Sequence, residues 1–310
     1  MARIVVTEFM DASAVASLAA AHDTRYLPDL CDRSDALTAE AAGADALVVR
    51  NRTQVRGALL DGATKLRVVG RLGVGLDNID VAACEARGIV VIPATGANAQ
   101  AVAEYVIASA MLLLRGSYRS TAAVAAGEWP RAALSDGREI AGKTLGVIGF
   151  GDIGRRVARL GRVIGMRAIA HEVAVPADAP LWREEGVEPF DLGRLLAEAD
   201  VVTLHVPLVA ATRRMIDARR LASMKPGAIL IDTARGGIVD EAAVAAALAS
   251  GRLRGAALDV FESEPLPAGS PLANAPNLIL TPHIAGLTHE ANTRVSTMIA
   301  ERVLAALARS

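Results

Sequence analysis

Three apolar stretches of the chain each end in ionisable side chains. Arg235 follows the first, "ILIDTARGG"; Asp259, Glu262 and Glu264 follow the second, "GAALDVFESEP"; and His283 follows the third, "NLILTPH". An imidazole titrates near neutrality and can exchange a proton with a hydroxyl group. A carboxylate beside it fixes the tautomer and favours the protonated form, and a guanidinium group can hold a substrate carboxylate. This combination predicts oxidation of a hydroxy acid, with a hydride leaving the carbon and a proton leaving the oxygen.

Each of these residues also has an ordinary structural explanation. A single histidine after a proline is usually structural, Glu262 and Glu264 could be loop acids, and Arg235 could cap a loop. In parallel α/β sheets, however, ligands bind outside the carboxyl ends of the strands. Complementary groups at three successive strand ends therefore favour an active site. His171 and His289 lack such a context and are expected to be structural or exposed.

A glycine-rich turn provides the predicted cofactor site. In "TLGVIGFGDIGRRVARL" a strand pattern precedes the G-x-G-x-x-G motif and a helical pattern follows it, which is the context that the motif needs. The glycines permit a tight turn and close approach of a pyrophosphate, which the helix N-terminus attracts. The motif comprises Gly149, Phe150, Gly151, Asp152, Ile153 and Gly154.

An acid at the end of the next strand pattern completes the cofactor prediction. Glu172 lies 18 residues beyond Gly154, close to the spacing expected for a residue that accepts ribose hydroxyls. A carboxylate there repels a 2′-phosphate, so NAD is predicted rather than NADP. The alternative is that the glycines form only tight turns. The strand, the helix and the acid together favour the cofactor.

The elements that must position these residues form two series. Short β-branched runs alternate with alanine-rich helical patterns over residues 1–98, and a second alternation begins at "TLGVIGF". This predicts an α/β fold with two wound, largely parallel sheets. The segment 287–310 reads as a helix with no strand after it, so we expect it to pack on the first domain. Its apolar residues lie three or four positions apart: Val295, Met298, Ile299, Val303 and Leu304.

Composition excludes several other classes of protein. The chain has 310 residues, a formal net charge of -1 and 52% hydrophobic residues, so neither a nucleic-acid surface nor a disordered chain is expected. No apolar run is long enough to span a membrane, and the N-terminus does not resemble a signal peptide. Cys31 and Cys84 lack metal-site spacing and are expected to be small buried hydrophobes. No metal is predicted, and a cytoplasmic location is expected.

Two arginines close the strand pattern of "ALVVRNRTQV". Side chains alternate along a strand, so Arg50 and Arg52 could point the same way if the strand continues through them. Two adjacent guanidinium groups repel each other unless an anion lies between them. The alternative is that one or both pair with acids on the surface.

The chain resembles the D-isomer-specific 2-hydroxyacid dehydrogenases, and most closely their phosphoglycerate dehydrogenase-like and sulfolactate dehydrogenase-like members. The similarity covers nearly the whole chain and is most specific in "VVGRLGVGLDNIDV", "TLGVIGFGDIGRRVA", "MKPGAILIDTARGGIVDEAAVAAAL", "GAALDVFESEPLP" and "LILTPHIAG". The resemblance implies that Arg235 binds substrate, that His283 is the acid/base, and that Glu264 rather than Glu262 pairs with it.

The resemblance also implies the domain arrangement. A Rossmann cofactor domain, residues 99–284, is expected as an insertion in a discontinuous flavodoxin-like substrate domain, residues 1–98 and 285–310. Members of the family are usually dimers joined through the inserted domain. The partners expected are therefore NAD, a small 2-hydroxy or 2-oxo acid and a second copy of the chain.

Further binding residues follow from the same resemblance. Asp259 is expected beside the nicotinamide amide, and a glycine loop should offer backbone amides to the substrate carboxylate. The additional cofactor contacts implied are His205, Val206, Pro207, Thr212, Thr233, Ala234, Arg235, Asp259, His283 and Gly286. The substrate contacts implied are Arg50, Asn51, Arg52, Leu72, Gly73, Val74 and Gly75, with the two arginines serving a second anionic group at C3.

Two departures from the family pattern leave alternatives open. Glu172 replaces the usual aspartate, which retains NAD with a longer side chain, and Leu72 stands where many members have a small residue, which should narrow the pocket. A hydroxypyruvate or glyoxylate reductase, with NADPH as a possible cofactor, is one alternative. A nucleotide-sensing relative without catalytic activity is the other.

Overall fold

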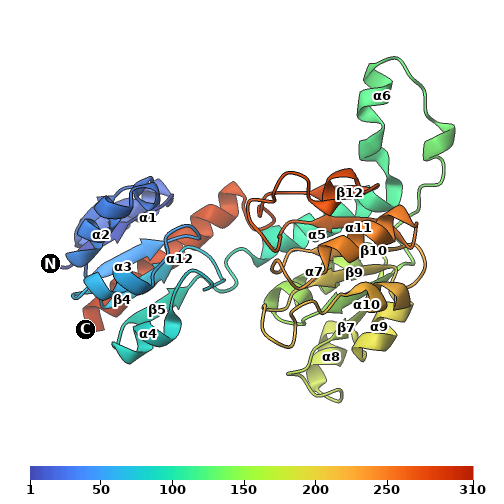
Figure 1. The fold of residues 1–310 in the computed structure, drawn as a ribbon. Helices are drawn as coiled ribbons and strands as arrows, with labels where there is room; N and C mark the ends of the chain where they lie inside the picture. Colours follow the sequence, from blue (N-terminus) through green and yellow to red (C-terminus); the bar gives the residue numbers. More distant parts are fainter. Residues whose placement is uncertain (310) are drawn as a thin grey trace. The chain divides into compact units, whose positions relative to one another are not determined.

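The computed structural model describes residues 1–309 and divides the chain into two compact units. The first unit comprises Met1–Asn98 with Leu287–Ser310, and the second comprises Ala99–Gly286. The chain returns to the first unit at residue 287, two positions after the expected 285. Each unit is built on one sheet whose paired strands all run parallel (Figure 1). This confirms the predicted α/β fold with two parallel sheets.

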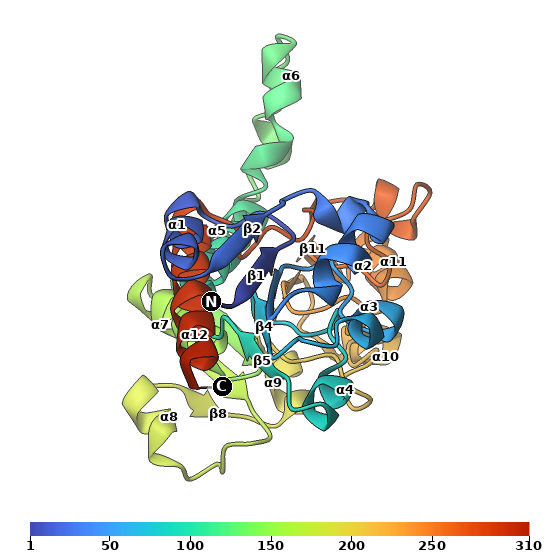
Figure 2. The same ribbon diagram turned by 90° about the vertical axis from the view of Figure 1, so that its left-hand side faces the viewer.

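The first unit has a sheet of five strands with helices on both faces. Residues that alternate along each strand enter two separate cores, one on each face. Helices α1 (Ala12–Ala21) and α12 (His289–Arg309) cover one face and lie side by side (Figure 2). The other face is covered by α2 (Ser34–Ala42), α3 (Gly57–Gly62) and α4 (Val81–Ala86). The strand order is β2 (Asp23–Tyr26), β1 (Arg3–Val6), β3 (Ala46–Val49), β4 (Val68–Arg71) and β5 (Val90–Pro93).

The last helix packs on the first unit, as its apolar stripe requires. It begins at His289, two residues later than expected, and buries Val295, Ile299 and Val303. A Cβ atom at Gly70 of β4 would lie 2.7 Å from Ile299 Cγ2, so this glycine allows the helix to approach the strand closely. The two ends of the chain therefore share one core, which makes the first unit discontinuous.

The second unit has a sheet of seven strands, also covered on both faces. One face carries α5 (Ala99–Arg115), α7 (Asp152–Val163) and α8 (Pro180–Glu185). The other carries α9 (Leu192–Glu198), α10 (Ala218–Ser223) and α11 (Glu241–Ala249). The strand order is β12 (Leu278–Leu280), β11 (Leu253–Leu258), β10 (Ala228–Asp232), β9 (Val201–Leu204), β6 (Thr144–Ile148), β7 (Arg167–His171) and β8 (Glu188–Pro189). The winding reverses between β6 and β9, which is the switch point where open α/β sheets bind nucleotides.

An arm extends from the second unit between α5 and β6. It carries the short helix α6 (Thr121–Ala125) and projects from the body of that unit in both ribbon views (Figures 1 and 2). Short 3₁₀ helices occur at Leu30–Asp32, Ser117–Arg119, Ala132–Leu134 and Pro271–Asn274. No helix within residues 1–309 is long and apolar enough to cross a membrane.

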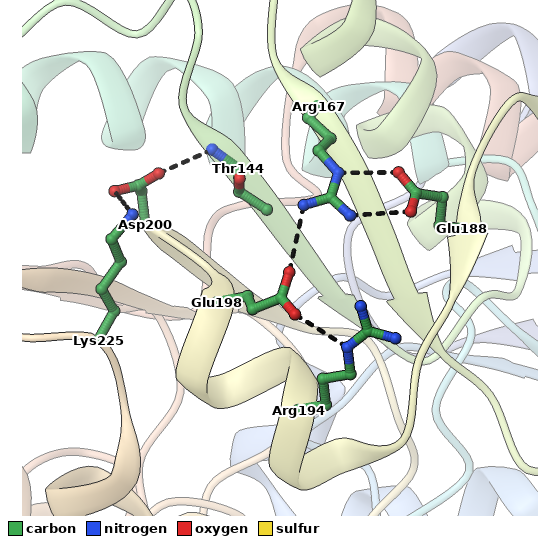
Figure 3. Close-up of polar contacts among 7 residues, drawn as sticks. All are labelled: Thr144, Arg167, Glu188, Arg194, Glu198, Asp200 and Lys225. Atoms are coloured by element: carbon green, nitrogen blue, oxygen red, sulfur yellow. Dashed lines mark hydrogen bonds and ion pairs between the residues drawn. The ribbon is translucent and has the colours of Figure 1, made fainter.

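Ion pairs hold together the amino-terminal edge of the second sheet (Figure 3). Arg167, at the start of β7, donates two 2.8 Å hydrogen bonds to Glu188 and one of 3.2 Å to Glu198. The bonds from Arg167 lower the pKa of Glu188. A hydrogen bond from Arg194, and after it the bond from Arg167, lower the pKa of Glu198. Asp200 accepts the first amide of β6 at 2.9 Å and pairs with Lys225 at 2.8 Å. These ion pairs stabilise the amino-terminal edge of the sheet, whereas the predicted catalytic residues follow the carboxyl ends of the strands.

Candidate active site

The predicted residues of the second unit lie at the carboxyl edge of its sheet, in the order of the strands. His283 follows β12, Asp259 and Glu264 follow β11, and Arg235 follows β10. Further along the same edge lie the turn after β9, the glycine motif after β6 and the acid after β7. Parallel pairing makes this convergence unavoidable, because every strand ends on the same side of the sheet.

His283 and Glu264 are in direct contact. Nδ1 of His283 lies 2.8 Å from Oε2 of Glu264, and Oε1 of that carboxylate accepts the Phe261 amide at 3.1 Å. His283 has φ +57°, in the left-handed region that few non-glycine residues adopt. Its amide donates to Asp259 O at 2.8 Å, which holds the turn in this shape. The imidazole therefore has one nitrogen engaged by a carboxylate and the other available for a substrate.

Glu262 takes a different role from Glu264. Its carboxylate faces Arg214 at 3.7 Å, and its amide donates to Glu241 Oε1 at 2.7 Å. The acid that meets the imidazole is Glu264, in agreement with the residue that the family resemblance indicates.

Asp259 is a buried support for the loop that carries His283. Its side chain is 1% exposed and accepts the amides of Ile284 and Ala285 at 2.8 Å each. It also accepts the Thr281 hydroxyl at 2.6 Å, and that hydroxyl lies 2.5 Å from the hydroxyl of Tyr105. Thr281 and Tyr105 were not predicted, because nothing in the sequence places a residue of α5 beside the end of β12.

A close backbone approach sets the position of Arg235. A Cβ atom at Gly236 would lie 1.7 Å from the carbonyl oxygen of Phe261, so only glycine lets the loops after β10 and β11 touch. Arg235 is half-buried, and its Nη1 donates to Ala234 O at 2.6 Å. The buried Asp232, just before it, accepts the Ala234 amide at 2.8 Å, and burial raises its pKa to about 7. Asp232 was missed, although it also ends a strand.

The glycine motif has the shape that a dinucleotide requires. Gly149 has φ +92°, and a Cβ atom there would lie 2.4 Å from His205 O. A Cβ atom at Gly154 would lie 2.1 Å from Gly149 O, so this glycine lets α7 start directly against the turn. Gly151 faces open space, with no atom within 4 Å of its Cβ position. The turn and the start of α7 thus form an open cradle for phosphates.

Within the motif, side chains and backbone serve different purposes. The Phe150 ring is 3% exposed and stacks on Trp182 with ring centroids 4.8 Å apart, so it belongs to the core. Ile153 packs against the same core, and Asp152 begins α7 and pairs with Arg156 at 3.4 Å. Phosphate contacts by this segment must therefore come from its amides.

Glu172 lies beside the cradle. Its Oε2 accepts the Phe150 amide at 2.9 Å and its Oε1 accepts the Ala174 amide at 2.9 Å. A carboxylate at this distance from the phosphate turn is placed to meet ribose hydroxyls. Further along the edge, the Thr233 hydroxyl is buried without a hydrogen-bond partner, as expected of a group that awaits a ligand. The cradle, the acid and this hydroxyl fit NAD.

The turn after β9 is a neutral wall of the same site. Burial lowers the pKa of His205 to about 3, so this imidazole is uncharged at physiological pH. Its Nε2 lies 3.0 Å from the Thr203 hydroxyl. The Thr212 hydroxyl donates to Pro207 O at 2.6 Å and so holds the turn. Val206 packs against the core beneath α9 to α11, and Ala234 is part of that core. Gly286, half-buried, is the last residue of the unit.

The first unit presents its predicted substrate residues at the carboxyl edge of its own sheet. The main chain after β3 converges on Glu8, which follows β1 and is 4% exposed. The Glu8 carboxylate accepts the amides of Arg50, Arg52 and Thr53 at 2.8, 3.1 and 3.0 Å. Asn51 is exposed at the tip of this turn. Glu8 was missed, although an acid two residues after a strand was a readable signal.

The two arginines have different environments. Nη2 of Arg50 donates to Asn292 Oδ1 at 2.6 Å, and its guanidinium lies 5.8 Å from the centre of the Phe9 ring. Desolvation lowers the pKa of Arg50. The exposed Arg52 forms an ion pair with Asp32. One arginine is thus half-buried with its guanidinium against neutral groups, and the other pairs with a surface acid, as the alternative interpretation expected.

The glycine loop after β4 offers fewer groups than expected. The Leu72 side chain is 2% exposed and packs in the core beneath α12, so it does not narrow a pocket. The Gly73 amide donates to Arg71 O at 2.7 Å. The amides of the more exposed Val74 and Gly75 are therefore the better candidates for a substrate carboxylate. Among residues 1–309, no group of three His, Cys, Asp or Glu residues is suited to hold a metal.

Comparison with known proteins agrees with this geometry. A family model described as the NAD binding domain of D-isomer specific 2-hydroxyacid dehydrogenases matches residues 107–285. The chain is 52% identical to (S)-sulfolactate dehydrogenase from Chromohalobacter salexigens, covering 99% of both proteins. It is 39% identical to D-3-phosphoglycerate dehydrogenase from Methanocaldococcus jannaschii, covering 98% of this chain but 57% of that protein.

Solved structures show the same fold. D-lactate dehydrogenase from Aquifex aeolicus, complexed with NAD and lactic acid, superposes with a TM-score of 0.86 at 29% identity and covers 99% of this chain and 96% of that one. The chain belongs to the D-isomer specific 2-hydroxyacid dehydrogenase family. It is an NAD-dependent oxidoreductase of 2-hydroxy acids, which confirms the predicted enzyme class and cofactor.

Proposed function

We propose that this dehydrogenase acts on a 2-hydroxy acid that carries a second anionic group on C3, of the 3-sulfolactate or 3-phosphoglycerate type. The observation that carries the proposal is the turn after β3, which presents Arg50 and Arg52 from one main-chain segment tied to Glu8. The name of the relative at 52% identity, a sulfolactate dehydrogenase, supports a sulfonate as that group.

In the proposed reaction, the second unit supplies the groups that move the proton. His283 accepts the proton of the C2 hydroxyl in oxidation and returns it in reduction. Glu264, 2.8 Å from the other ring nitrogen, fixes the tautomer and stabilises the imidazolium. Arg235 holds the C1 carboxylate and polarises the C2 oxygen. NAD, when bound, supplies the nicotinamide that accepts the hydride.

In the first unit, the proposed roles concern recognition. The amides of Val74 and Gly75 bind the C1 carboxylate, and the two guanidinium groups bind the C3 anion. Arg52 is paired with Asp32 in the structure. Ion pairs between exposed side chains contribute little to stability, so Arg52 can exchange this partner for a substrate anion at small cost.

A two-substrate comparison tests the proposal. For Arg52→Ala and Arg50→Ala, the KM for 3-sulfopyruvate should rise by about 10- to 100-fold, the range expected when a charged hydrogen bond is lost. The KM for glyoxylate, which has no C3 group, should change little. Arg56→Ala is the matched control, because among the described residues this exposed arginine donates only to the main-chain oxygen of Asp77. Equal losses on both substrates would reject the dianionic preference.

The pairing of Arg52 with Asp32 supports a second candidate, a hydroxypyruvate or glyoxylate reductase. In that enzyme both arginines would be structural, and a panel of 2-oxo acids would show no preference for sulfonate or phosphate. The non-catalytic sensor is disfavoured by the contact between His283 and Glu264. A protein that binds NADH yet is inert toward the whole panel would restore it.

We also propose that the enzyme is a homodimer. Apolar side chains are exposed on the arm and on α5 of the second unit, including Trp129 at 79% and Val124 at 45%. We assign these surfaces to a homodimer contact. Trp129→Glu should therefore lower the mass measured by light scattering to that of a monomer, and an unchanged mass would contradict the assignment.

A cytoplasmic location is consistent with two free cysteines among the described residues.

A further inference from the structure

Glu8 is a buried acid whose carboxylate accepts hydrogen bonds from the turn after β3. It is 4% exposed, and its two oxygens accept three main-chain amides, those of Arg50, Arg52 and Thr53. Burying a carboxylate is costly unless several donors replace its water, and three amides supply that replacement. The turn and the acid therefore depend on each other.

A second buried side chain donates hydrogen bonds to the carbonyl oxygens of the same turn. Asn78 is 5% exposed, and its Nδ2 donates to Arg50 O at 3.1 Å and to Thr53 O at 2.7 Å. The hydroxyls of Thr7 and Thr53 lie 2.7 Å apart, which ties the turn to β1 beside Glu8. The backbone from residue 50 to residue 53 is thus fixed at both its donors and its acceptors, and so are the starting points of the two arginine side chains.

The charge of Glu8 matters as well as its shape. Desolvation lowers the pKa of Arg50, and the negative charge of Glu8 partly offsets this effect. The hydrogen bond to Asp32 is the main cause of the raised pKa of Arg52, and the charge of Glu8 adds to it. Arg50 otherwise contacts only neutral groups among those described, Asn292 and the Phe9 ring. A neutral side chain in place of Glu8 would leave two like charges on a turn that has lost its anchor.

We infer that Glu8 is a positioning residue that sets the specificity of the enzyme for a C3 anion, by holding Arg50 and Arg52 on one rigid turn. Glu8 itself touches no substrate, because its carboxylate is buried and satisfied by amides. This inference rests on the proposed function, since it gives Glu8 its effect through the two arginines. It predicts that the selectivity between substrates, rather than turnover as such, depends on this acid.

The test compares two substrates in Glu8→Gln. Glutamine has one carbonyl oxygen to accept amides, and its NH₂ group would oppose the Arg52 amide. The KM for 3-sulfopyruvate should rise by about 10- to 100-fold, as expected for loss of a charged anchor. The KM and kcat for glyoxylate should stay within about threefold of wild type. Glu8→Asp keeps the charge on a shorter side chain and should give an intermediate ratio of the two KM values.

The matched control is Glu40→Gln in the same unit. Glu40 of α2 pairs with Arg3, the first residue of β1, at 3.1 Å and with Arg25 of β2 at 2.9 Å, and it has no contact with the turn among the described residues. It should leave the KM ratio unchanged. Circular dichroism and Tm establish that each variant is folded, and Glu8→Asp carries the test if Glu8→Gln is not.

The outcomes separate this inference from the proposed function. A KM ratio that changes in Glu8→Gln and partly recovers in Glu8→Asp supports the positioning role. Equal losses on both substrates, or an unchanged ratio, overturn it. If Arg50→Ala and Arg52→Ala change the KM for 3-sulfopyruvate and the KM for glyoxylate equally, the proposed preference for a dianionic substrate is itself rejected. Glu8 is then only a structural anchor of the turn.

Discussion

Oε2 of Glu264 lies 2.8 Å from Nδ1 of His283, and the two residues come from loops after neighbouring strands, 19 positions apart in the chain. The contact is possible because the two strands run parallel and end on the same edge of the sheet. The pair is 36% to 43% exposed at its side chains, so a substrate can reach it from that edge. Four expected outcomes follow from this edge and its neighbours.

Replacing the imidazole should stop the chemistry without removing the cofactor. In His283→Ala, kcat should fall by about 10²- to 10⁴-fold, the usual contribution of a general acid or base. The Kd for NADH, measured by fluorescence titration, should remain close to the wild-type value because the glycine cradle is unaltered. The same substitution at His289, on the surface of the first unit, is the control. Near-normal turnover by His283→Ala would reject the role of this residue.

Removing the charge of the paired acid should have a smaller effect. Glu264→Gln keeps a carbonyl oxygen for the imidazole but loses the charge that stabilises the protonated ring, so kcat should fall by about 10- to 100-fold. Steady-state rates at saturating NADH measure this. Glu262→Gln, whose carboxylate faces Arg214 instead, should change kcat by less than about threefold. If Glu262→Gln proved the more damaging change, the assignment of the two acids would be reversed.

The acid beside the phosphate cradle should determine the choice between NADH and NADPH. In Glu172→Ser, the repulsion of a 2′-phosphate disappears while a hydroxyl remains for the ribose. The preference for NADH, taken as the ratio of the two kcat/KM values, should fall by about tenfold or more. Glu188→Ser, on the opposite edge of the sheet, should leave the preference intact. A wild-type enzyme with equal kcat/KM for both cofactors would already contradict the charge argument.

Burial of Asp232 should make stability depend on pH. Its pKa is about 7 in the folded chain, well above its ordinary value, so the folded state binds the proton more tightly than the unfolded state. The stability that this provides is complete below about pH 4 and is lost as the pH rises through 7.

Asp232→Asn cannot ionise but keeps an acceptor for the Ala234 amide. Between pH 5 and 8, its free energy of unfolding should therefore decline less than that of the wild type, by up to about 2.7 kcal/mol, because the wild type loses 1.36 kcal/mol per pH unit over the roughly two units between pH 5 and the folded pKa. Urea unfolding at a series of pH values measures the difference. Asp191→Asn, at an exposed helix N-cap, serves as the control. Parallel declines in the wild type and Asp232→Asn would show that another group is responsible.

The predictable part of the fold and of the site came from local patterns. Alternating strand and helix patterns indicated two parallel sheets, and the return of segment 287–310 followed from an apolar stripe with no strand to follow it. The glycine motif, Glu172 and the set at three strand ends were readable because parallel sheets bring strand ends together. These features depend on spacing along the chain, which the sequence contains in full.

Other features of the site depend on contacts between distant segments. Thr281 beside Tyr105, Asn292 beside Arg50 and the amides around Glu8 join residues separated by up to 242 positions. Leu72, expected in a pocket, lies in the core because α12 covers that face of β4.

By itself, the sequence determined which residues end the strands and therefore which chemistry the edge of each sheet can perform. Only the tertiary structure decided which arginine is half-buried and which is paired with an acid, and which acid holds the turn that carries both. The physical reason is that residue types and their spacing act locally, whereas hydrogen-bond partners and desolvation depend on the segments that packing brings alongside.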